Sequence, residues 1–161
     1  MPSVISKFTG LVFGEGKGDK NFLIALIGLD KFKFHTRKWQ FNFDNGKGCS
    51  AEDVLKECKK SIIGKSFDVV LCFIDLDDLK HKYPKSWMLQ KGKLEREYSQ
   101  IDIIWQIDKL EDELKKVIGN VSKSKGKLNR QAIRDIEKFI NSDYYKKVLK
   151  VIKDRENEIT E

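Results

Sequence analysis

Proline, histidine and cysteine are scarce in this chain of 161 residues, and each scarcity argues against a class of protein. With two prolines, the chain has no Pro-rich linker that could separate domains. The two histidines, His35 and His81, are isolated from each other and from the cysteines, which argues against a histidine-based metal site. The three cysteines form no C-x-x-C pair and are odd in number. This argues against a disulfide framework or a zinc site, and we expect reduced, buried thiols at Cys49, Cys58 and Cys72.

Long apolar runs are also missing. No stretch approaches the roughly 18 apolar residues that a membrane-spanning helix needs. The start of the chain lacks the hydrophobic segment of a signal peptide. The sequence therefore predicts a soluble, cytoplasmic protein with no membrane partner.

What the chain does contain is a well-distributed apolar fraction and an excess of positive charge. Hydrophobic residues make up 40% of the sequence and are spread along its length, enough for one globular core but not for two. The formal net charge is +7. This charge favours an acidic partner, most commonly nucleic acid, but a generally lysine-rich surface explains it equally well.

Strand and helix patterns alternate through the first two-thirds of the chain, which predicts an α/β fold with a mainly parallel sheet. We expect residues 1–120 to form this α/β unit and residues 121–161 to form a helical extension that packs on it or extends from it. The predicted strands cover 8–14, two alternating runs on either side of a parity break at His35–Lys38, the apolar run "SFDVVLCFID", and "SQIDIIWQI". The predicted helices cover 19–29 with Asp19 as its cap, 50–60 opened by Ser50, 108–119, the segment around Leu128–Ile140, and the segment around Tyr145–Ile152; residues 79–97 are expected to be loop with some helix.

The glycine-rich stretch "GEGKGDK" resembles a nucleotide loop at first sight, but it fails both common patterns. A P-loop needs G-x-x-x-x-G-K followed by Ser or Thr, and here Lys17 is followed by Gly18 and Asp19. The dinucleotide pattern G-x-G-x-x-G fails because residue 19 is aspartate. We therefore expect the glycines to turn the backbone tightly, so that the carboxylate of Glu15 is presented.

Carboxylates follow two of the predicted strands. Glu15 ends the first strand, and Asp75, Asp77 and Asp78 end the buried strand "VVLCFID". If these strands are neighbours, the carboxylates converge at one edge of the sheet, where a divalent cation would offset their repulsion. Mg²⁺, or Mn²⁺ in its place, is the expected ion. The alternative is a polar strand-to-helix turn in which one aspartate caps a helix.

With these motifs, "LVFGEGKGDKNFLIAL" followed by "VVLCFIDLDDL", the sequence resembles the TOPRIM family over about residues 8–110. This family includes topoisomerases, primases, ribosomal-RNA maturation nucleases and OLD-type nucleases. The resemblance implies a Rossmann-like TOPRIM fold with a four-stranded sheet flanked by helices. It also implies Glu15 as general acid/base, Asp75 and Asp77 as magnesium ligands, and Gly16 as the glycine that lets the chain turn beside the ion. Asp78 has no firm family counterpart, although it could join the metal ligands.

The resemblance implies magnesium-dependent cleavage of phosphodiester bonds in DNA or RNA, and so a nuclease. Two alternatives stay open. The chain could be a nucleic-acid-binding or regulatory module without turnover. It could also be a subunit that acts with a separate ATPase in phage-related defence, since OLD-type nucleases carry such a domain and this chain has no Walker motif. The sequence indicates neither DNA nor RNA, nor an oligomeric state.

Lysines flank the carboxylate motifs and predict contacts to phosphates. Aromatic residues among them, Tyr83, Trp87 and Tyr98, could stack on bases or pack back onto the sheet. The candidate nucleic-acid-binding residues are Lys17, Lys20, Lys47, Lys80 and Lys82.

Overall fold

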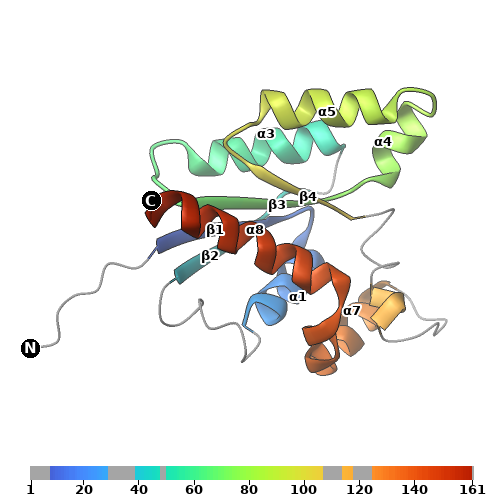
Figure 1. The fold of residues 1–161 in the computed structure, drawn as a ribbon. Helices are drawn as coiled ribbons and strands as arrows, with labels where there is room; N and C mark the ends of the chain where they lie inside the picture. The colour runs from blue at the N-terminus through green and yellow to red at the C-terminus, as the bar shows by residue number, and fades with distance from the viewer. Residues whose placement is uncertain (1–7, 29–38, 48–49, 107–113, 118–124, 161) are drawn as a thin grey trace, which may run out of the picture.

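A parallel sheet of four strands lies at the centre of the computed structural model, which describes residues 8–28, 39–47, 50–106, 114–117 and 125–160. The strand order is β2-β1-β3-β4, so β1 and β3 are the central strands (Figure 1). The predicted α/β class with a parallel sheet is confirmed. The strands are β1 (Phe8–Gly14), β2 (Trp39–Asn45), β3 (Val69–Asp75) and β4 (Asp102–Gln106).

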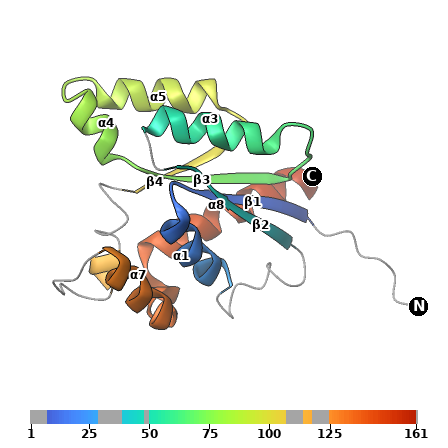
Figure 2. The same cartoon turned by 180° about the vertical axis from the view of Figure 1, so that it is seen from behind.

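Helices cover both faces of the sheet (Figures 1 and 2). One face carries α3 (Ala51–Ile62), α4 (Asp77–Lys82) and α5 (Trp87–Glu97). The opposite face carries α1 (Lys17–Ile27), α7 (Lys125–Arg134), the 3₁₀ helix η1 (Ile136–Asn141) and α8 (Asp143–Thr160). Within the described residues, no helix has both the length and the apolar character needed to cross a membrane.

The alternation of side chains along β3 shows how the sheet divides the core. Val69, Leu71 and Phe73 pack in the cluster on the α1 and α8 face, whereas Cys72 and Ile74 pack in the cluster on the α3 face. A strand buried on both faces needs a continuous apolar run, and that pattern predicts this strand from the sequence. The same alternation places the Asp75 position on the α1 and α8 face.

The predicted strands 8–14 and "SQIDIIWQI" are confirmed as β1 and β4, and the second alternating run is confirmed as β2. The helix opened by Ser50 is also confirmed, since Ser50 Oγ accepts a hydrogen bond of 3.3 Å from the Asp53 N–H. The parity break at His35–Lys38 and most of the predicted helix 108–119 lie outside the described residues, and only 114–117 are seen to be helical.

The structure differs from two local predictions. Helix α1 begins at Lys17 with Gly16 at its N-cap, so Asp19 is not the cap but a buried residue of the first turn. Residues 79–97 are largely helical, because the few apolar residues there, such as Leu79 and Leu94, are buried against the sheet. These apolar residues are widely spaced, so the sequence shows no clear helical periodicity in this segment. The tertiary contacts that bury them cannot be read from the sequence.

The predicted helix around Leu128–Ile140 is interrupted. Helix α7 ends at Arg134, and a 3₁₀ segment follows, in which Phe139 is fully buried. The Phe139 ring lies edge-on against Phe22 of α1, with 5.2 Å between the ring centroids. This contact places the Phe139 side chain of the 3₁₀ segment in the core.

The C-terminal helices share the core of the sheet. Leu128, Tyr145 and Val148 belong to the same buried cluster as Val12 and Phe22. Each large side chain buried in this way contributes about 1.5–3 kcal/mol to stability. Polar contacts reinforce this docking: Trp39 Nε1 donates to Glu156 Oε2 at 3.3 Å, and Arg155 Nη2 donates to both carboxylate oxygens of Asp102 at 2.9 Å.

Candidate functional site

Two carboxylates meet where the central strands end. Strands β1 and β3 pair in parallel with Phe13 opposite Cys72, so the ends of both strands lie at one edge of the sheet. There, the backbone N–H of Asp75 donates a hydrogen bond of 3.0 Å to Oε1 of Glu15. The structure thus brings together the carboxylates of the two sequence motifs, because the chain crosses over to place β3 directly beside β1.

The environment of Glu15 strongly disfavours its negative charge. Burial raises the pKa of Glu15, and the nearby charge of Asp75 raises it further, to about 8. The hydrogen bond from the Asp75 N–H acts in the opposite direction, but it is outweighed by these two causes. In the absence of a cation, Glu15 therefore holds a proton at neutral pH. Such a group can transfer a proton, or it can exchange that proton for a metal ion.

Asp19 is a third carboxylate near this pair. It lies in the first turn of α1 and is only 5% exposed, and its charge also raises the pKa of Glu15. The sequence predicted Asp19 as a helix cap. The signal that could have identified it is its spacing of four residues from Glu15 across a strand-to-helix turn, which places it next to the strand end.

Asp77 and Asp78 follow the pair at the start of α4, and both are half-buried. Asp78 Oδ2 accepts a hydrogen bond of 3.2 Å from the Ala51 N–H at the start of α3. The sequence left open a different role, in which an aspartate caps the helix after its own turn, and that helix, α4, has no side-chain cap. Asp78 is thus hydrogen-bonded to the start of α3. Asp77 lies two residues after Asp75 in the sequence.

Among the described residues, no group of three His, Cys, Asp or Glu side chains is arranged to hold a metal ion. Magnesium, however, is commonly bound by one or two carboxylates, with waters and substrate phosphates filling the remaining positions. The carboxyl groups of Glu15 and Asp75, which are near enough for the charge of Asp75 to raise the pKa of Glu15, supply a donor set of that size. The pair therefore fits Mg²⁺, and the ion remains a prediction.

The glycines beside Glu15 do not act as the sequence suggested. Gly16 has φ −146° and ψ 176°, an extended conformation open to any residue, so no glycine-only turn presents Glu15 at this position. Gly14 is required for a different reason. A Cβ atom there would lie 3.3 Å from the Asp19 Cβ, the Leu23 Cδ1 and the Lys20 backbone nitrogen. Gly14 thus allows α1 to approach the end of β1 closely, whereas the space next to Gly16 is open.

The candidate phosphate-binding lysines all follow strands at this edge. Lys17 and Lys20 lie in the first turns of α1, and Lys80 and Lys82 lie on α4. Lys47 follows β2, whose end is held against β1 by a hydrogen bond of 2.9 Å from the Gly46 N–H to the Gly14 carbonyl. Lys17, Lys47 and Lys82 are exposed, and Lys20 and Lys80 are half-buried.

The three aromatic residues on or directly after α4 and α5 differ in how far they are buried. Tyr98 is buried and packs against the sheet, so it is not available for base stacking. Trp87 and Tyr83 are half-buried, and each lies under a lysine. The Lys80 Nζ is 5.0 Å from the Trp87 ring centroid, and the Lys82 Nζ is 5.5 Å from that of Tyr83. These cation–π contacts hold the two ammonium groups over aromatic rings on or beside α4 and α5.

The predicted reduced thiols are present at two of the three cysteines. Cys58 and Cys72 are free and fully buried, and burial raises the pKa of the Cys72 thiol, which makes it unreactive. Cys49 lies outside the described residues.

Comparisons of the chain with protein-family models, with curated proteins and with solved structures found no match.

Proposed function

We propose that this protein is a metal-dependent nuclease that cleaves phosphodiester bonds, with Glu15 and Asp75 at its centre. The observation that carries the proposal is the hydrogen bond between these residues, which unites two separate carboxylate motifs at the carboxyl edge of a parallel sheet. Ligands and reacting groups of open α/β sheets gather at this edge. The TOPRIM resemblance, which is limited to the motifs, is consistent with the same site.

Each residue has a role set by its surroundings. Glu15, with its raised pKa, holds and releases a proton near neutral pH, as a general acid/base must. Asp75, together with Asp77, would hold Mg²⁺ or Mn²⁺. When bound, the ion would polarise the phosphodiester and stabilise charge that develops on it. The cations of Lys17 and Lys20, which lie in the first turns of α1, would attract and orient the phosphate backbone of DNA or RNA.

A cleavage assay tests this proposal. Labelled single- and double-stranded DNA and RNA are incubated with Mg²⁺ or Mn²⁺ and with the parent protein, Glu15→Gln or Asp75→Asn. Glu95→Gln is the matched control, since Glu95 is exposed on α5 and makes the same change of charge. We expect both site variants to lose activity by about 10²-fold or more, and the control to retain it. Equal cleavage by all four proteins would exclude the assignment.

A nucleic-acid-binding module without turnover is the second candidate. The observation in its favour is that exposed or half-buried lysines surround the Glu15–Asp75 pair in sequence, and such cations can bind phosphates without any cleavage. Binding that persists in EDTA, with no cleavage under either metal, would favour this candidate over the nuclease. A reducing cytoplasm suits both candidates, because it keeps buried thiols such as Cys58 and Cys72 free.

A further inference from the structure

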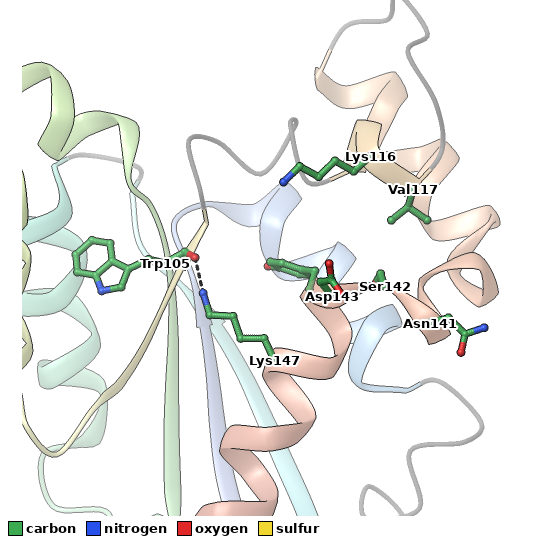
Figure 3. Close-up of a pocket in the computed structure, with 8 residues that line it drawn as sticks. Trp105, Lys116, Val117, Asn141, Ser142, Asp143 and Lys147 are labelled. Carbon is green, nitrogen blue, oxygen red and sulfur yellow. Dashed lines mark hydrogen bonds between the residues drawn. The ribbon is translucent and has the colours of Figure 1, made fainter.

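A cavity of about 340 Å³ lies between the end of β4 and the start of α8 (Figure 3). Its volume is within the range of about 300–1,000 Å³ that is typical of small-ligand sites. None of the sequence motifs includes the residues that line it. The lining residues that matter here are Trp105, Lys116, Ser142, Asp143, Tyr144 and Lys147.

The cavity shares both the edge and the face of the sheet with the Glu15–Asp75 pair. Asp75 and Gln106 are register partners on the adjacent strands β3 and β4, which are spaced about 4.8 Å apart. The Gln106 side chain is buried on the α8 face, where its Nε2 donates a hydrogen bond of 2.9 Å to the Tyr144 hydroxyl. Because Asp75 follows the same alternation, its position faces the side on which the cavity lies.

Two lysines approach the cavity from different elements. The Lys147 Nζ donates a hydrogen bond of 2.9 Å to the Trp105 carbonyl, which holds this ammonium group at the end of β4. Lys116 comes from the helical segment 114–117, and its amine extends toward the same space (Figure 3). With Asp143 as the acidic side chain of the lining, the two lysines leave an excess of one positive charge.

The start of α8 adds to this positive potential. Helix α8 has 18 residues, so its peptide dipoles sum to a partial positive charge at the end that borders the cavity. Ser142 Oγ accepts a hydrogen bond of 3.2 Å from the Tyr145 N–H, which fixes the first turn in place. A cavity of this size with an excess of positive charge suits a phosphate group together with its nucleoside.

We propose that this cavity is a second phosphate subsite, which binds a nucleotide of the same strand next to the one held at Glu15 and Asp75. The subsite rests on the proposed function for its ligand. Binding at this subsite would use residues other than Glu15 and Asp75, and it would require neither a metal ion nor cleavage. Lys116 and Lys147 would contact the phosphate, and the cavity would take up the attached sugar.

Binding in EDTA to proteins that carry Glu15→Gln tests the subsite without cleavage. A short fluorescent single-stranded oligonucleotide is titrated at several salt concentrations with this background protein, with added Lys116→Gln, and with added Lys115→Gln. Lys115 is the matched control, because, like Lys116, it is an exposed lysine of the segment 114–117, but it does not line the cavity. A parallel titration uses inorganic phosphate, followed by chemical-shift changes, to separate a free anion from a strand.

We expect Lys116→Gln to weaken oligonucleotide binding about three- to tenfold and to lower the slope of log affinity against log salt by about 0.7, as the loss of one phosphate contact should. Lys115→Gln should change both quantities much less. Equal losses in the two variants would overturn the subsite, since they would report general charge. Phosphate binding that depends on Lys116, with oligonucleotide binding that does not, would also overturn it.

The subsite and the nuclease proposal can fail separately. A Lys116-specific loss of binding without any metal-dependent cleavage would support the subsite and favour the binding module. Cleavage that depends on Glu15, with equal effects of the Lys115 and Lys116 variants, would support the nuclease and exclude the subsite.

Discussion

The Asp75 backbone N–H lies 3.0 Å from Oε1 of Glu15, although the two residues are sixty positions apart in the chain. This relationship joins the ends of the two central strands and confines two carboxylates to a half-buried space. Two ionised carboxylates in such a space repel each other, so either a proton or a cation is needed there.

Without divalent cations, the stability of the protein should fall as the pH rises from about 4.5 to about 8. In this window Glu15 is protonated in the folded chain, where its pKa is about 8, and ionised in the unfolded chain, where its ordinary value is 4.5. The folded state thus binds the extra proton, and raising the pH weakens it. Glu15→Gln removes the effect, so at pH 8 this variant should exceed the parent in the free energy of unfolding by about 1–3 kcal/mol.

Urea unfolding in EDTA at several pH values measures this difference. Near pH 4.5 the two proteins should be similar, and the gap should open toward pH 8 and then stay constant. Parallel pH profiles for the parent and Glu15→Gln would show that Glu15 has no raised pKa.

Mg²⁺ should stabilise the parent protein at pH 8. An ion that binds only the folded state adds about 2.7 kcal/mol at a concentration one hundred times its dissociation constant. Thermal unfolding with and without MgCl₂ measures this gain as a rise in the midpoint. The rise should vanish in Glu15→Gln and Asp75→Asn and persist in Glu95→Gln. A rise that all the variants share would place the ion elsewhere.

Gly14→Ala should destabilise the protein more than Gly16→Ala. A methyl group at residue 14 would lie 3.3 Å from the Lys20 backbone nitrogen and from the Leu23 side chain, so these atoms would have to move by a few tenths of an ångström. We expect a cost of about 1–3 kcal/mol. Residue 16 has open space and an extended backbone, so Gly16→Ala should lose only the N-cap preference of glycine over alanine, about 0.5 kcal/mol. Chemical denaturation of both variants decides the point, and equal costs would contradict the proposed packing role of Gly14.

Asp78→Ala should reduce stability without removing catalysis. The substitution deletes the acceptor for the Ala51 N–H at the start of α3, and loss of such a cap costs about 0.5–2 kcal/mol. Urea unfolding and the cleavage assay are performed on the same sample below its unfolding transition. Unchanged stability with lost cleavage would instead assign Asp78 to the metal site, as the sequence alone allowed.

Glu156→Ala should loosen the attachment of α8 to the sheet. It removes the acceptor for the Trp39 indole N–H, and a buried donor without its acceptor costs about 1–3 kcal/mol. Glu158→Ala is the control, because Glu158 is exposed on the same helix and pairs with Arg155 at the surface. Unfolding free energies should separate the two variants by at least about 1 kcal/mol. Equal values would show that the Trp39 contact does not anchor the helix.

Much of the fold could be predicted from the sequence, because local patterns encode it. The continuous apolar run of β3, the alternation of Trp39 and Phe41 in β2, and the Ser50 cap of α3 are signals within a few residues of each other. Predictions were wrong where distant contacts decide local structure. The helix predicted through Ile140 gives way to a 3₁₀ segment, in which Phe139 packs on Phe22, more than one hundred residues away.

The candidate site shows the same division. The sequence by itself determined which carboxylates stand at strand ends and that lysines surround them, since residue type and strand position can be read directly from the chain. Only the tertiary structure decided that Asp78 is hydrogen-bonded to α3, that Asp19 is buried near Glu15, and that a cavity lies at the start of α8. The physical reason is that hydrogen bonding and burial depend on which elements lie side by side. Strand order and helix packing set those neighbours, and no short stretch of sequence contains them.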